Sequence, residues 1–66
     1  MQPNPGHLPS EADGTDEGKT LRVHVILRSG YDSRERAPQG WAATGRGACN
    51  WRLTKSAFDI LEWELI

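Results

Sequence analysis

The 66-residue chain lacks most of the features that hold very small proteins together. Cys49 is its only cysteine, which excludes an intramolecular disulfide, and His7 and His24 lie far from it and from each other in the sequence. We therefore expect no structural metal and no cofactor. The fold must depend on a small hydrophobic core, to which Cys49 is predicted to contribute as a small buried side chain.

Long hydrophobic runs are also missing. No apolar stretch approaches the roughly 20 residues that cross a bilayer, and the first residues do not resemble a secretory signal. A lone cysteine fits a reducing compartment. These features predict a soluble, cytoplasmic protein with no membrane partner.

No catalytic motif is present. His24, Ser56 and Asp59 are residue types of a hydrolytic triad, but their spacing matches no such arrangement. The glycines between residues 40 and 47 lack the lysine and hydroxyl residue that complete a phosphate-binding loop. We expect the protein not to be an enzyme and to have no catalytic residues.

The clearest feature that is present lies at residues 21–28, where apolar and polar side chains alternate. Successive side chains of a strand point to opposite faces of a sheet, so this period of two predicts a half-buried strand. Residues 41–44 and 48–53 are predicted to form further short strands, with turns before and between them. The predicted fold is a small all-β or β-rich α+β domain containing an antiparallel sheet of three to four strands.

Residues 1–18 differ from the rest in composition. They are acidic and rich in proline and glycine, with Leu8 as the only sizeable aliphatic residue after Met1. Such a segment buries too little apolar surface to offset its ordering entropy. We expect an extended polar tail over residues 1–18 and a β-rich domain over residues 19–66.

The C-terminal residues 57–66 fit two structures. In a helix, Phe58, Leu61 and Leu65 would share one face, but Glu62 and Glu64 would then oppose the dipole at the helix C-terminus. A strand is therefore favoured. In a regular strand one face would carry Asp59, Leu61, Trp63 and Leu65, and the other Phe58, Ile60, Glu62, Glu64 and Ile66.

The charges are segregated along the chain. Residues 1–18 hold four acidic and no basic residues, residues 19–55 hold all eight basic and two acidic residues, and residues 56–66 hold three acidic ones. The basic middle suggests a nucleic-acid-binding surface in which cations contact phosphates and a ring stacks on bases. Its candidate residues are Arg34, Arg36, Arg46, Arg52 and Trp41. The alternative is that the tryptophans are core and the arginines solvated, which the near-neutral net charge favours.

The acidic ends suggest the opposite interaction. Spaced carboxylates can imitate phosphates and occupy a nucleic-acid-binding groove on another protein. The residues predicted to bind a partner in this way are Glu62, Glu64, Glu11, Asp13, Asp16 and Glu17. Solubility is the simpler explanation for the same acidic residues.

Short motifs spread over roughly residues 21–65 resemble a pattern found in small, uncharacterised phage and prophage proteins. They consist of the strand and turn at residues 23–30, then Trp51, then an Asp59-Ile60-x-x-Trp63 strand. The resemblance implies a β-rich fold and a phage origin, and it transfers no catalytic residue. Because small phage proteins are often inhibitors of host machinery, it implies a protein that binds and inhibits a host bacterial protein complex in the host cytoplasm. An anti-CRISPR protein acting on a CRISPR effector is its sharpest version, and a small nucleic-acid-binding accessory protein is the alternative.

Overall fold

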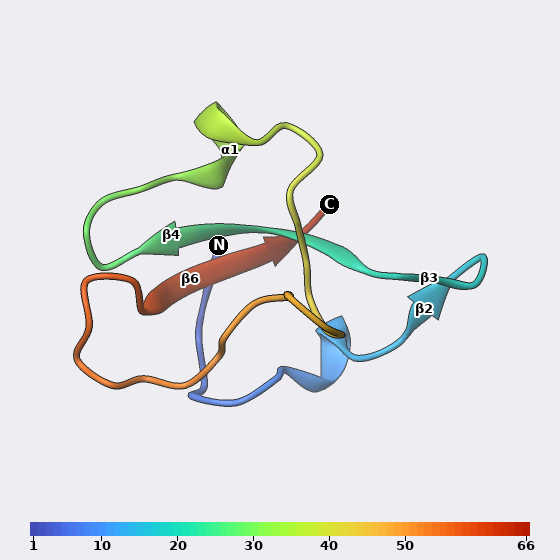
Figure 1. The fold of residues 1–66 in the computed structure, drawn as a ribbon, viewed down its shortest axis with the longest axis horizontal. Helices are drawn as coiled ribbons and strands as arrows, with labels where there is room; N and C mark the ends of the chain where they lie inside the picture. Colours follow the sequence, from blue (N-terminus) through green and yellow to red (C-terminus); the bar gives the residue numbers. More distant parts are fainter.

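A computed structural model describes residues 1–66 (Figure 1). The domain is β-rich, with a four-stranded antiparallel sheet in the order β1-β6-β4-β5 and a separate hairpin of β2 and β3. None of its helices is long and apolar enough to cross a membrane. The elements in chain order are β1 (Gln2–Pro3), the 3-10 helix η1 (Ser10–Ala12), β2 (Thr15–Asp16), β3 (Lys19–Thr20), β4 (Arg22–Leu27), α1 (Ser33–Arg36), β5 (Trp41–Ala42) and β6 (Ile60–Leu65).

The long strands β4 and β6 form the centre of the sheet. The alternation in residues 21–28 correctly predicts β4, because Val23, Val25 and Leu27 are buried and the residues between them are not. The strand alternative for the C-terminal segment is also confirmed, since β6 pairs antiparallel with β4 along its length. The predicted fold class, a small β-rich domain with an antiparallel sheet, is therefore confirmed.

A β-bulge in β6 corrects the predicted division of its faces. Ile26 pairs with Glu62, whereas the next residue, Leu27, pairs with Ile60, so Leu61 is an extra residue on β6. A bulge of this kind shifts the alternation by one position. Ile60 consequently lies on the core face with Trp63, and not on the face of Glu62 as a regular strand requires.

The core lies on one face of the sheet, beneath the N-terminal segment and the irregular chain of residues 43–59 (Figure 1). Trp51 and Trp63 meet edge to face with ring centroids 5.7 Å apart, a favourable geometry for aromatic pairs. The Trp51 Nε1–H donates to the carbonyl of Ala43 at 2.8 Å. The buried apolar residues are Ala12, Val23, Val25, Leu27, Ala43, Trp51, Ile60 and Trp63.

Residues 1–18 do not form the extended tail that their composition predicts. Gln2 and Pro3 add an edge strand to β6, and Ala12 is fully buried in the core. Asn4 is also buried, and its side-chain amide is satisfied there because it donates to the carbonyls of Trp51 and Ile60. The segment is thus held by backbone and amide hydrogen bonds, which a hydrophobicity argument does not count.

The outer edge of β4 is covered by the residues that follow it. The backbone N–H of Val25 donates to Oγ of buried Ser33, and this hydroxyl also lies 3.0 Å from Nδ1 of His24. Asp32 caps α1 by accepting from the backbone N–H of Arg34. These contacts hold the short helix α1, within the polar segment of residues 29–40, against the sheet.

Of the two short strands predicted for the second half of the chain, only the first forms. Trp41 and Ala42 pair with β4 as β5, whereas residues 48–53 are irregular although they carry the buried Trp51. Gly40 precedes β5 with a φ of 71°, and a Cβ there would lie 2.6 Å from the carbonyl oxygen of Val23. Glycine is therefore required for the chain to enter this edge of the sheet.

Candidate partner-binding groove

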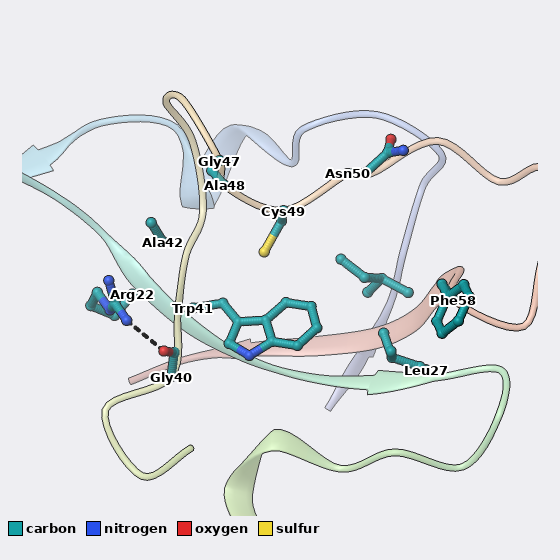
Figure 2. A pocket seen from close by; sticks show the side chains of 11 residues that line it. Arg22, Leu27, Gly40, Trp41, Ala42, Gly47, Ala48, Cys49, Asn50 and Phe58 are labelled. Atoms are coloured by element: carbon teal, nitrogen blue, oxygen red, sulfur yellow. Dashed lines mark hydrogen bonds between the residues drawn. The ribbon is translucent and has the colours of Figure 1, made fainter. Parts of the chain in front are cut away.

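The largest hollow of the surface is a groove of about 580 Å³ between β5, residues 47–50 and the residues that lead into β6. We call it the Trp41–Phe58 groove. Figure 2 shows the Trp41 ring between Arg22 on one side and Leu27 and Phe58 on the other. Its lining residues are Arg22, Leu27, Gly40, Trp41, Ala42, Gly47, Ala48, Cys49, Asn50, Phe58 and Ile60.

Trp41 is held at the edge of the sheet and is half-buried. Its backbone pairs with Val23 in β4, and its ring packs against Tyr31 with centroids 5.7 Å apart and planes tilted by 34°. Trp41 is thus a wall of the groove, with its position set by β5 and by a second aromatic ring.

The Cys49 thiol points toward Trp41 in Figure 2 and packs against the core. Burial raises the pKa of Cys49 to about 11, despite the opposing charge of the Arg22 guanidinium. The protonated thiol is a poor nucleophile and a poor metal ligand at neutral pH. No cluster of three or more histidine, cysteine, aspartate or glutamate side chains is placed to hold a metal. The Cys49 side chain therefore contributes an uncharged, weakly polar surface to the groove.

Phe58 forms the outer wall of the groove and is 78% exposed. A phenyl ring on a flexible loop would lose conformational entropy on binding. The loop of residues 54–58, however, is held in one conformation. The carboxylate of Asp59 accepts hydrogen bonds from the backbone N–H groups of Thr54, Lys55 and Ser56 at 2.8–3.2 Å. Phe58 is thus presented at a defined position next to Trp41.

The charge of Asp59 is stabilised although its side chain is only 3% exposed. Burial acts to raise the pKa of Asp59, but hydrogen bonds from Arg28, Thr54 and Lys55 outweigh it and lower the pKa below its ordinary value. The Arg28 guanidinium lies 3.0 Å from this carboxylate. The negative charge of Asp59 is therefore compensated by Arg28 and by the N–H groups of the loop, and it is not available to a ligand in the groove.

Arg22 is the only charged residue that lines the groove. Its guanidinium donates to the backbone carbonyls of Gln39 and Gly40 and forms no ion pair. These hydrogen bonds fix the orientation of the side chain while leaving its positive charge without a protein counterion.

The six acidic residues predicted to bind a partner are distributed over several parts of the molecule. Glu62 and Glu64 pair with Ile26 and His24, on the sheet face opposite the core. Glu11 belongs to η1, which packs on the core face through Ala12, and Asp13 follows it. Asp16 and Glu17 lie at the β2–β3 hairpin, at one end of the molecule (Figure 1).

The residues of the alternative nucleic-acid set are also divided. Arg34 and Arg36 lie on α1, where Arg34 forms a 2.7 Å ion pair with Asp32 and its hydrogen bond lowers the pKa of that aspartate. Arg46 and Arg52 are exposed on the irregular segment of residues 43–59. Among the five residues of this set, only Trp41 lines the groove.

Sequence reasoning did not select Phe58, Leu27 or Arg22 as site residues. In the sequence Phe58 is one apolar residue of an ambiguous helix or strand, and its exposure follows from the hydrogen bonds of Asp59 to residues 54–56. In the sequence Arg22 is one polar residue of an alternating strand. The carbonyls that its guanidinium contacts, of Gln39 and Gly40, lie 17 and 18 residues away. The only local signal in the sequence is a phenylalanine directly before an aspartate.

Comparison of the chain with protein-family models, with curated proteins and with solved structures finds no match.

Proposed function

We propose that the chain is a non-enzymatic protein-binding domain that contacts its partner through the Trp41–Phe58 groove. The observation that carries the proposal is the presentation of Phe58, which is 78% exposed beside a groove and fixed by the buried Asp59. Aromatic side chains are enriched among the residues that dominate protein interfaces. A rigid loop also lowers the entropy lost on binding.

The partner in this proposal is a host bacterial protein complex, which a phage-encoded protein binds and inhibits in the host cytoplasm. This part is supported by the resemblance to small phage proteins. In its most specific form, the partner is a CRISPR effector. Glu62 and Glu64 lie on the sheet face opposite the core, away from Leu27 and Ile60 in the groove, so in this proposal they form a second, acidic contact surface. In that role they would oppose a nucleic-acid-binding surface of the partner.

Affinity capture from bacterial lysate, followed by a binding measurement with the purified captured protein, tests the proposal. Phe58→Ala should weaken binding at least about 30-fold, the loss typical of a dominant interface residue. Leu53→Ala is the matched control, because Leu53 is an exposed apolar residue close in the chain that does not line the groove. Equal capture by both variants would show that the groove is not the binding surface.

A nucleic-acid-binding accessory protein is the second candidate function. It is supported by the position of Trp41 beside Arg22, with Arg46 on the adjoining loop. Binding of a thymine oligonucleotide that weakens steeply with added salt and is lost in Trp41→Ala would favour it. The protein-binding proposal expects no such binding.

A further inference from the structure

We propose that the Trp41–Phe58 groove takes an acidic peptide segment of another protein. An apolar side chain of this segment would lie at the Phe58 end of the groove and a carboxylate at the Arg22 end. The inference rests on the proposed function and adds the chemistry of the partner.

The Phe58 end of the groove is apolar. Leu27 and Ile60 are paired across the two central strands and supply its inner wall, and the Phe58 ring stands outside them. Covering the exposed ring with an aliphatic or aromatic side chain removes apolar surface from water at roughly 25 cal/mol per Å². This end therefore selects an apolar residue of the partner.

The Arg22 end of the groove is a site for an anion. Its guanidinium is oriented by the carbonyls of Gln39 and Gly40 and has no counterion within the protein. A carboxylate at this end would meet a cation whose orientation is already fixed, so little ordering is needed on binding.

The chain segment that forms most of the groove carries charge of one sign. Residues 40–58 contain Arg46, Arg52 and Lys55 and no acidic residue. The carboxylate that follows this segment, Asp59, is buried and paired with Arg28. Asp16 and Glu17 line a separate hollow that Arg22 also borders. Charge complementarity therefore favours an acidic partner segment over a neutral or basic one.

A peptide fits these observations better than a nucleic acid. The groove has a single lining cation and an apolar inner wall, whereas a nucleic-acid strand requires a row of cations along its backbone. The chain has a net charge of −1, with acidic residues at both ends that repel an extended polyanion. A short acidic segment in the groove lies against residues 40–58, which include no acidic residue.

Selection from a library of random short peptides, with the full chain as bait, tests this inference. Peptides that also bind the Phe58→Ala variant are discarded. We expect the remaining peptides to combine an apolar residue with aspartate or glutamate. In a synthetic peptide, replacing these acids by asparagine or glutamine should weaken binding to the wild-type protein about fivefold per carboxylate, with a larger loss at low salt.

Two arginine variants locate the carboxylate. Arg22→Gln should weaken binding of the acidic peptide about fivefold and abolish the effect of neutralising the one carboxylate that lies at the Arg22 end, while Arg22→Lys should retain part of the affinity. Arg36→Gln is the matched control, because Arg36 lies on α1 outside the groove. Thermal melting of Arg22→Gln checks that residues 39–40 keep their place. The neutralised peptides test the same contact on the unmodified protein.

Each other outcome overturns the inference. Phe58-dependent peptides that are neutral or basic would refute the acidic partner but leave the groove as a protein-binding site. Recovery of no Phe58-dependent peptide would refute a peptide ligand, and the lysate comparison of Phe58→Ala with Leu53→Ala then decides separately on the proposed function. Groove-dependent binding of a thymine oligonucleotide in place of peptides would assign the site to nucleic acid.

Discussion

Two irregular segments cover the core, and each is organised by one buried polar side chain. In the N-terminal segment, Asn4 donates to the carbonyls of Trp51 at 3.0 Å and Ile60 at 2.8 Å, and accepts from the backbone N–H of Gly6 at 2.8 Å. In the segment of residues 43–59, Asp59 accepts from three successive backbone N–H groups and from the Thr54 hydroxyl. Both side chains replace hydrogen bonds that a regular strand or helix would supply.

The two devices differ in range and in charge. The amide of Asn4 donates to Trp51 and Ile60, which follow it in the sequence by 47 and 56 positions. It therefore docks one end of the chain onto the other. The carboxylate of Asp59 mostly contacts residues three to five positions away, so it shapes a single loop. A neutral amide is insensitive to acid, whereas a carboxylate loses its acceptor capacity when protonated. The N-terminal segment should therefore depend on long-range packing and the loop on pH.

The largest expected loss of stability is for a substitution of Trp51, which belongs to the segment of residues 43–59 and also contacts the N-terminal segment. Trp51→Ala removes the ring that packs on Trp63, and it disturbs the chain whose carbonyl accepts from Asn4. We expect a loss of about 3–5 kcal/mol in the free energy of unfolding, which is enough to unfold so small a domain. Denaturant titration measures it, with the half-buried Trp41→Ala as a milder control. A loss below about 1 kcal/mol would contradict the shared core.

The next effect concerns the N-terminal segment alone. Asn4→Ala leaves the carbonyls of Trp51 and Ile60 without their donor, and should cost about 1–3 kcal/mol. Gln2→Ala, at an exposed position of β1, is the control and should change stability by no more than about 0.5 kcal/mol. An extended tail without packing contacts would give a change of that smaller size on removal of all of residues 1–18. The burial of Asn4 and Ala12 now predicts a larger loss for that deletion.

The two segments should differ in how their contribution to stability depends on pH. The folded-state pKa of Asp59 lies below its ordinary value of 3.8, so its contribution to stability is present at neutral pH. It is lost as the pH falls below about 4 toward the folded-state pKa, because the unfolded chain then binds the proton more readily. Asp59→Asn should reduce stability at pH 7 and flatten its decline in acid, as followed by thermal melting. Asn4→Ala should leave that decline unchanged. An equally steep decline in Asp59→Asn would assign it to other carboxylates.

The smallest expected effect is on the residue that the Asp59 loop presents. Phe58→Ala removes an exposed ring and should change the free energy of unfolding by no more than about 0.5 kcal/mol. Denaturant titration checks this. A loss of several kcal/mol would mean that Phe58 packs in the fold, and a loss of partner binding by this variant would then be no evidence for the groove.

Sequence reasoning predicted the parts of the fold that depend on local patterns. The alternation around Val23 and Val25 is visible over a few residues, and so is the unfavourable charge placement that argues against a helix at residues 57–66. Docking of the N-terminal segment was missed because it depends on one amide, at Asn4, that reaches carbonyls far along the chain. Hydrophobicity assigns no weight to such a contact.

The candidate site was missed for a related reason. Trp41 was selected as a ring among cations, and the structure places it in the groove. Phe58 and Arg22 join it only because the chain around Asp59 and the chain around Gly40 meet the two ends of β4. That juxtaposition is set by the pairing of β4 with β5 and β6, and no spacing in the sequence encodes it.

The extra residue in β6 has a consequence for how the gene tolerates changes in length. Loss of the Leu61 codon would leave Leu27 opposite Ile60 and Ile26 opposite Glu62, so the two central strands would keep their partners. It would remove the carbonyl that accepts from the backbone N–H of Asn4 at 2.9 Å. The length of the last strand is therefore constrained by the first residues of the chain.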